Sequence, residues 1–192
     1  MLSAEPVVTG KVTGKARPSL ATPTDDGDWL AALDDACLGA GLPLAAEQAI
    51  RDSGTAWHDE DMAEAHVLRA FELAPEHPAT HIALYRFYFY RNRLVEAYEV
   101  GQRCLRYAAA LNGLPLAWRD VQPAQTDFSA YAALPRFYLF TLKGCAYLSL
   151  RLGRLEQGAA MVDKLLQLDP VDRVNGSVLR GVLDRLGRDD DE

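Results

Sequence analysis

The feature of this sequence that most limits its fold is a helical pattern that repeats after 34 positions. Between Asp59 and Ala97, an apolar-periodic segment ends at a proline, a short turn follows, and a second periodic segment begins. Ala63 and Ala97 occupy equivalent points of the two units and lie 34 positions apart. Helix–turn–helix units of this length stack side by side, because no single unit can bury its apolar face alone. The spacing therefore predicts an all-α chain built from stacked helix pairs.

Helical periodicity and end signals predict the other helices as well. The expected ranges are 29–38, 43–52, 59–73, 79–91, 94–111, 130–152, 155–168 and 174–186. The 130–152 segment reads either as one helix or as two pieces interrupted near Pro135. The 174–186 segment has apolar residues at strict four-residue steps and one polar side. Such a segment is typical of the capping helix that a stack of repeats needs at its end.

The remaining stretches divide the chain into a helical domain with two polar ends. Residues 1–27 are rich in Gly, Pro, Ser and Thr and lack a helical period, so we expect a flexible arm. Residues 28–186 form the expected domain, and 187–192 an acidic tail. A loop inserted at 113–130 breaks the repeat, and connections of this length are often functional. Alternatively, the loop is structural, and its Trp118 packs into the adjoining hydrophobic core.

Composition excludes several classes of function. The chain has 192 residues, 49% of them apolar, which suits one domain with a sizeable core. Its net charge of −7 argues against nucleic-acid binding, because phosphate recognition needs a basic surface. No secretory signal is visible, and the most apolar region, 128–150, is interrupted by Pro135, Arg136 and Lys143, so we expect no membrane span. Three widely spaced cysteines fit a reducing cytoplasm.

The sequence contains no pattern that indicates catalysis or a resident cofactor. Glycine loops for phosphate or dinucleotide binding and a Gly-x-Ser-x-Gly elbow are all missing. His77 and His81 are four positions apart, but Pro78 between them places His77 in a turn rather than on the same helix face. Cys104 and Cys145 fall on faces expected to be buried, where a thiol behaves as a small hydrophobe. We therefore expect a protein that is not an enzyme and that holds no cofactor and no metal.

The helical segments resemble the tetratricopeptide (TPR) repeat family, whose pattern places small residues where paired helices touch and a proline after the second helix. The matching residues are Ala63, Ala70 and Pro75; Leu84, Tyr88, Leu94, Ala97 and Cys104; and Cys145, Ala146, Gly153, Leu155, Gly158, Leu165 and Pro170. The resemblance implies a right-handed TPR-like solenoid of about three helix pairs plus a C-terminal capping helix. Tyr85 and Ala109 depart from the pattern, since the family prefers glycine and proline there.

A second resemblance is to small TPR-like proteins encoded among nitrogen-fixation genes, including a nitrogenase-associated factor. The similar phrase runs from His81 to Arg91 and continues as Arg93-Leu94-x-Glu96-Ala97. It implies an accessory role for nitrogenase or for its maturation.

The TPR resemblance also implies where a partner would bind, because the first helix of each unit lines the concave wall in that family. The residues carried over are Ile82, Arg86, Phe89 and Tyr90 from one unit, and Phe140, Lys143, Tyr147 and Arg151, with Leu150 beside them, from the last. Aromatic rings and cations are typical of binding hot spots for acidic partners. In the competing interpretation, Phe89 and Phe140 pack on the insertion and the cations are merely solvated.

The sequence thus predicts a cytoplasmic, non-catalytic adaptor or an assembly or protection factor. Its expected partner is another protein, either nitrogenase or a nitrogenase maturation component, with no nucleic acid and no membrane involved. The alternative is a self-associating structural repeat protein that forms a homodimer through the aromatic face. A small-molecule or metal-handling enzyme ranks third.

Overall fold

The computed structural model describes residues 41–130 and 132–189, and within these ranges the protein is all-α, without a strand. The seven α-helices are α2 (Leu44–Thr55), α3 (Glu60–Leu73), α4 (Pro78–Tyr90), α5 (Leu94–Leu111), α6 (Ala133–Arg151), α7 (Leu155–Leu168) and α8 (Ser177–Asp189). Two short 3₁₀ helices, η2 (Trp118–Asp120) and η3 (Pro123–Gln125), lie between α5 and α6. The expected arm 1–27 and the helix expected at 29–38 lie outside the described residues.

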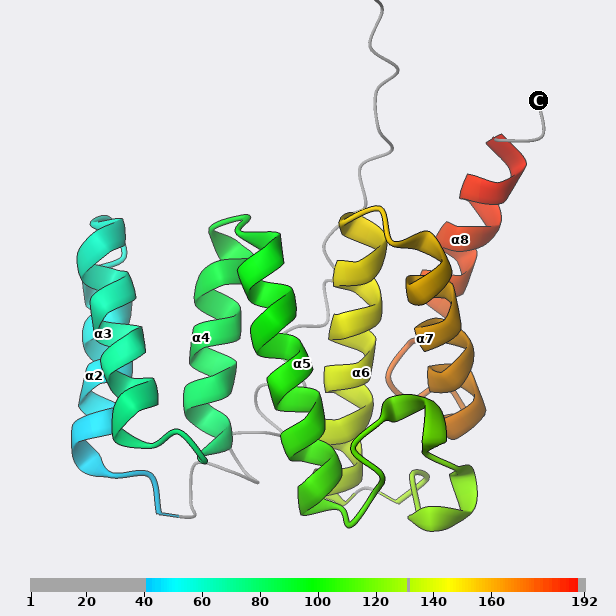
Figure 1. Ribbon diagram of the computed structural model, residues 1–192, viewed down its shortest axis with the longest axis horizontal. Coiled ribbons are helices and arrows are strands. Elements are labelled where there is room, and N and C mark those ends of the chain that lie inside the picture. Colours follow the sequence, from blue (N-terminus) through cyan, green and yellow to red (C-terminus); the bar gives the residue numbers. More distant parts are fainter. Residues whose placement is uncertain (1–40, 131, 190–192) are drawn as a thin grey trace, which may run out of the picture.

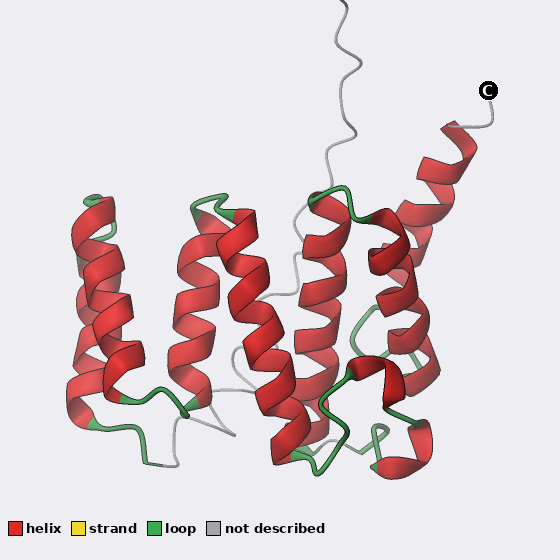
Figure 2. Ribbon diagram, viewed as in Figure 1, coloured by secondary structure: helices red, strands yellow, loops and turns green. Residues whose placement is uncertain are grey.

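Successive helices run in opposite directions and lie side by side along the longest axis of the molecule (Figure 1). The most extensive contacts join α2 with α3, α4 with α5, α5 with α6, and α6 with α7; α3 packs less extensively against α4, and α8 against α7. Short turns join the helices, except for the long connection between α5 and α6 (Figure 2). None of the helices within 41–130 and 132–189 is long and apolar enough to cross a membrane.

The ends of these helices follow from local side-chain chemistry. Asp59 caps α3, and its carboxylate accepts a hydrogen bond from the backbone N–H of Met62 at 3.1 Å. Pro78 stands in the first turn of α4, where its missing N–H costs no helical bond. The turns after α4 and α6 use Asn92 and Gly153, which both have positive φ. These local signals explain why α5 and α7 begin and end where the sequence predicts.

Several boundaries differ from the predictions, and one open alternative is decided. The helix α2 continues through Ser53 and Gly54 to Thr55. The helix α6 is a single piece, because Pro135 lies in its first turn and displaces no hydrogen bond there. The helix α8 begins only at Ser177, since the Val174 N–H is bound at 2.9 Å by the buried carboxylate of Asp169. It then runs to Asp189, so the first part of the expected tail at 187–192 is helical, and 190–192 lie outside the described residues.

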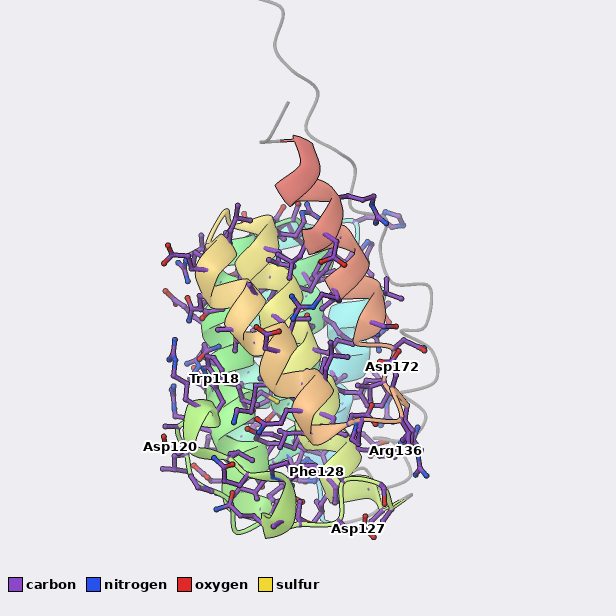
Figure 3. The ribbon with its side chains drawn as sticks, turned by 90° about the vertical axis from the view of Figure 1, so that its right-hand side faces the viewer. Trp118, Asp120, Asp127, Phe128, Arg136 and Asp172 are labelled. Atoms are coloured by element: carbon purple, nitrogen blue, oxygen red, sulfur yellow. The ribbon has the colours of Figure 1, made fainter. Side chains whose placement is uncertain are left out.

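The inserted segment 113–130 is part of the hydrophobic core. Leu114, Trp118, Val121 and Phe128 are all buried, and the ring of Phe128 lies 6.0 Å from the ring of Tyr138 in α6. The segment covers the lower ends of α6 and α7 (Figures 1 and 3). The expectation that Trp118 plugs the adjoining core is therefore confirmed.

Candidate functional site

The two helices α4 and α6 carry an unusual charge distribution. Their sequences contain no Asp or Glu, although the whole chain has a net charge of −7. Their cations are Arg86 in α4 and Arg136, Lys143 and Arg151 in α6. In α6 these cations alternate with Phe140 and Tyr147 at three- and four-residue steps, which places all five on one side of the helix. Cations are thus concentrated on two neighbouring helices of an acidic protein.

Aromatic rings join the two helices. The ring of Phe89 is stacked on that of Tyr85, with 5.8 Å between centroids, and lies 5.6 Å from the ring of Tyr90. On its other side it lies 5.9 Å from the ring of Tyr147 in α6. Phe89 therefore packs against tyrosines of both helices. The result is a continuous aromatic layer across α4 and α6.

Three of the four cations lie over these rings. The guanidinium carbon of Arg86 is 5.7 Å from the centroid of Tyr90, that of Arg136 is 5.8 Å from Phe140, and that of Arg151 is 5.7 Å from Tyr147. Arg151 also donates hydrogen bonds to the Tyr147 hydroxyl at 2.8 Å and to Asn92 Oδ1 at 3.3 Å. These contacts hold the cations in place beside the aromatic layer. We call this surface the α4–α6 face; it comprises Tyr85, Arg86, Phe89, Tyr90, Arg136, Phe140, Lys143, Tyr147 and Arg151.

The residues predicted for partner binding differ widely in exposure. Arg86 is exposed and the Tyr90 side chain is 49% exposed, whereas Phe89, Phe140 and Arg151 are half-buried. Lys143 and Tyr147 are buried, with 9% and 3% of their surfaces exposed. Ile82 is 8% exposed and belongs to the hydrophobic core, which corrects its assignment to a binding wall. The first turns of α4 are buried between α3 and α5, so that only the second half of the helix reaches the surface.

Two residues of the α4–α6 face were not among the predicted ones. Arg136 precedes Phe140 by four positions, so helical spacing places it beside the Phe140 that the TPR resemblance implied. Tyr85 was noted only as a departure from glycine. Glycines on the neighbouring helices leave space for the Tyr85 side chain. A Cβ added at Gly144 would lie 3.1 Å from the Tyr85 hydroxyl oxygen, and a Cβ added at Gly101 would lie 3.6 Å from the Tyr85 ring. Such compensation between helices is not visible in the sequence.

The helix α4 is held firmly against its neighbours by polar groups. The hydroxyl of Tyr88 donates to Glu64 Oε1 in α3 at 3.0 Å, and burial together with this bond raises the pKa of Tyr88 to about 12. Arg93, after α4, donates to Glu64 Oε2 at 2.5 Å and lies 4.7 Å from the centroid of the Tyr88 ring. Arg91 lies 4.3 Å from the centroid of Trp57 and donates to the Trp57 carbonyl. These bonds join the α2–α3 pair to the α4–α5 pair and fix how α4 presents its second half.

The histidines and cysteines lie apart from this face in other roles. His77 caps α4, its Nδ1 accepting from the Ala79 N–H at 3.2 Å, while His81 bonds the Pro75 carbonyl through Nε2 at 2.7 Å. Cys104 and Cys145 are buried, and burial raises the pKa of the Cys145 thiol far above its ordinary value. Within 41–130 and 132–189, no group of three or more His, Cys, Asp or Glu side chains is arranged to hold a metal ion. Cys37 lies outside the described residues.

The helices and their surface define an all-α protein with a cationic, aromatic face on two adjacent helices. Comparison with curated proteins then places the chain. It is 38% identical over 152 residues to a protein of Azotobacter chroococcum mcd 1 described as an uncharacterized 19.8 kDa protein in the nifW 5′ region, and the match covers 78% of this chain and 85% of that protein. The chain belongs to the family of that protein. No family model matches the sequence. No solved structure matches it.

Proposed function

We propose that this protein is a non-catalytic, cytoplasmic adaptor, or an assembly or protection factor, that binds another protein through the α4–α6 face. In this proposal the three helix pairs and α8 form a right-handed TPR-like solenoid with a capping helix, and the α4–α6 face belongs to its concave side. The small residues at helix contacts support that geometry. Gly158 is one example, because a Cβ there would overlap Leu150 of α6.

The observation that carries the proposal is the separation of charge. The cations on α4 and α6 face no acid from their own helices, and the aromatic rings beside them provide flat apolar area. Arg and Tyr are enriched at the centres of protein interfaces, and local cations attract acidic partners even when the net charge is negative. Arg86 and Tyr90 are the exposed members that a partner would meet first.

Family membership supports the more specific version, in which the partner is nitrogenase or a nitrogenase maturation component. The Azotobacter relative is described as a protein in the nifW 5′ region, and neighbouring bacterial genes often serve one process. The chain would then act in nitrogen fixation as an accessory factor rather than as an enzyme.

Affinity capture from nitrogen-fixing cells of the native host tests this function. The wild-type chain should enrich nitrogenase or one of its maturation components, quantified by mass spectrometry against cells grown on ammonium. The double variant Arg86→Glu with Tyr90→Ala should lose that enrichment by tenfold or more, on the order of the loss of about 1.4 kcal/mol that one interface contact provides. Both residues are surface residues, so helix content should stay unchanged.

The matched control is Arg69→Glu, which reverses the same charge on the exposed side of α3, where Arg69 pairs with Glu72. Arg69→Glu should capture the partner as well as wild type does. Equal capture by the Arg86/Tyr90 variant would remove the α4–α6 face from the proposal, and enrichment of no nitrogen-fixation protein would remove the nitrogenase version.

Self-association through the same face is the second candidate. The observation that favours it is the 49% exposure of Tyr90 beside the exposed Arg86, since aromatic residues are enriched in homodimer interfaces. Sedimentation equilibrium distinguishes self-association from the adaptor function. A dimer that forms with rising concentration and that Tyr90→Ala abolishes would favour this candidate over the adaptor.

A further inference from the structure

We propose that the α4–α6 face recognises an acidic segment of its partner in which two side-chain carboxylates flank an apolar residue, and that Arg86 and Arg151 bind those carboxylates. The inference rests on the proposed function, because it concerns the same face, and it adds the chemistry of the segment that this face binds. Three aromatic rings and two guanidinium groups carry it.

The three rings form a continuous row across the two helices. The Phe89 ring lies between the ring of Tyr90 in α4, 5.6 Å away, and the ring of Tyr147 in α6, 5.9 Å away. Phe89 is half-buried and Tyr147 is buried, whereas Tyr90 is 49% exposed. The row therefore offers its contact area for an apolar side chain of a ligand mainly at Phe89 and Tyr90.

One guanidinium group lies at each end of this row. Arg86 extends over Tyr90 and Arg151 over Tyr147, each with its guanidinium carbon 5.7 Å from the ring centroid. Arg151 is held in place by its hydrogen bonds to the Tyr147 hydroxyl and to Asn92 Oδ1. A guanidinium group has five N–H donors, so Arg151 keeps donors for a ligand beyond these two bonds. Because its position is fixed before binding, it loses little side-chain entropy when it binds a carboxylate.

Neither guanidinium group forms an ion pair with a carboxylate of residues 41–130 or 132–189. The acceptors of Arg151 are neutral groups, and α4 and α6 contain no Asp or Glu. The arginines that follow α4 differ, because Arg91 and Arg93 form ion pairs with glutamates of α3 and α5. The carboxylates of a ligand would supply to Arg86 and Arg151 the charge that these glutamates supply to Arg91 and Arg93.

Two other contacts between an arginine and a ring show what is particular to this row. Arg119 lies 4.3 Å from the ring centroid of Trp118, and Arg154 lies 4.6 Å from that of Tyr98. Both rings are buried, so each contact offers a ligand a cation but little apolar area. The α4–α6 face instead combines two cations with an exposed ring, which suits a ligand that is both acidic and apolar.

The separation of the two cations favours side-chain carboxylates over the carboxylate at the end of a chain. Arg86 and Arg151 lie over the two outer rings of the row, so a single terminal carboxylate would meet only one of them. Two Asp or Glu side chains on either side of an apolar residue meet both. Single-stranded nucleic acid also binds rings and arginines, but the net charge of −7 repels a polyanion.

Peptide selection tests the proposal with the full-length chain and no natural partner. The library displays random short peptides whose two ends are both joined to the carrier, so that no free C-terminus is present. Wild type should select peptides with Asp or Glu on both sides of an aromatic or aliphatic residue. In fluorescence anisotropy, Arg86→Gln and Arg151→Gln should each weaken the binding of a selected peptide, amidated at its C-terminus, by about tenfold.

The matched control is Arg119→Gln, which removes the cation over the buried ring of Trp118 and should leave the affinity unchanged. A charge reversal separates recognition from misfolding. The double variant Arg86→Glu with Arg151→Glu should select peptides rich in Lys and Arg, which a misfolded protein could not do.

Three results would overturn the proposal. They are selection of peptides without acidic residues, equal affinities of all three glutamine variants, and binding that requires a free C-terminal carboxylate. Displacement of the peptide by an oligothymidylate would assign the face to single-stranded nucleic acid instead. The selection uses no nitrogen-fixation protein, so its failure leaves the outcome of affinity capture open, and a failed capture leaves the selected peptides unchanged.

Discussion

At the scale of single residues, His81 shows how α4 tolerates a polar group in its buried half. The imidazole lies between the rings of Phe71, 5.0 Å away and nearly perpendicular, and Tyr107, 5.6 Å away and stacked. Its Nε2 donates to the Pro75 carbonyl, and its Nδ1 is buried without a hydrogen-bond partner within the described residues. Burial lowers the pKa of His81 below 6.5, because a charged ring would have to be desolvated.

This lowered pKa predicts a dependence of stability on pH. The unfolded chain takes up a proton at its ordinary pKa of 6.5, before the folded chain does, so protonation favours unfolding. The contribution of His81 is fully present above pH 6.5 and is lost as the pH falls through the lower pKa of the folded state. Urea unfolding at pH 7.5 and 5.0 should show a loss of stability at the lower pH, and His81→Phe should reduce that loss.

The exposed His58 provides the control for this measurement. His58→Gln should keep the wild-type difference between the two pH values, because it changes an exposed side chain and leaves the buried His81 in place. An equal pH dependence in wild type and in His81→Phe would show that carboxylates alone cause it.

At the scale of elements, a close approach between helices lies where α7 meets α6. A Cβ on Gly158 would overlap Leu150 Cδ2 and would come within 3.2 Å of the Leu150 backbone nitrogen. The backbone atom cannot move without shifting α6, so the contact depends on a residue that has no side chain. The TPR resemblance marked Gly158 as such a small residue.

Gly158→Ala should therefore destabilise the protein by about 1–3 kcal/mol, despite the higher helix propensity of alanine. The matched variant is Gly54→Ala in α2, where a Cβ would meet no atom within 4 Å. Gly54→Ala should be neutral or should stabilise by up to about 1 kcal/mol. Chemical denaturation of both proteins measures the difference, and equal effects would contradict the proposed close packing.

At the scale of the whole molecule, the 113–130 insertion closes one end of the helical stack. The Lys164 ammonium of α7 donates to the Val121 carbonyl at 2.9 Å, and Arg173, before α8, donates to the Ser129 carbonyl. Trp118 and Arg136 lie on opposite sides of the molecule (Figure 3), so the 3₁₀ turn η2 is remote from the start of the α4–α6 face. The insertion is thus a structural plug for α5, α6 and α7.

Removing a buried side chain of the 113–130 insertion should destabilise the protein much more than removing an exposed one. Trp118→Ala removes a side chain that is only 7% exposed and should cost about 3–5 kcal/mol. Leu116→Ala, at a position that is 57% exposed two residues earlier, should change stability by less than about 0.5 kcal/mol. Thermal or urea unfolding would measure both, and a mild effect at Trp118 would mean that the insertion can separate from the core.

The candidate site shows where sequence reasoning ends. Arg86 and Tyr90 were predicted because the TPR resemblance implies that their positions line the binding wall, and the structure leaves both exposed. Ile82 follows from the same resemblance but is buried, because exposure depends on how much of α4 its neighbours cover. Spacing within one helix cannot give that information.

The sequence by itself determined the helices and their order, because caps, prolines, turn residues and apolar periodicity act over a few neighbouring positions. Asp59, Pro78 and Asn92 set their boundaries without help from distant parts of the chain. Only the tertiary structure decided that Trp118 belongs to the core, that Gly144 and Gly101 make room for Tyr85, and that Phe89 meets Tyr147. Those contacts join residues far apart in the chain, and their energies depend on packing, which appears only when the helices are assembled.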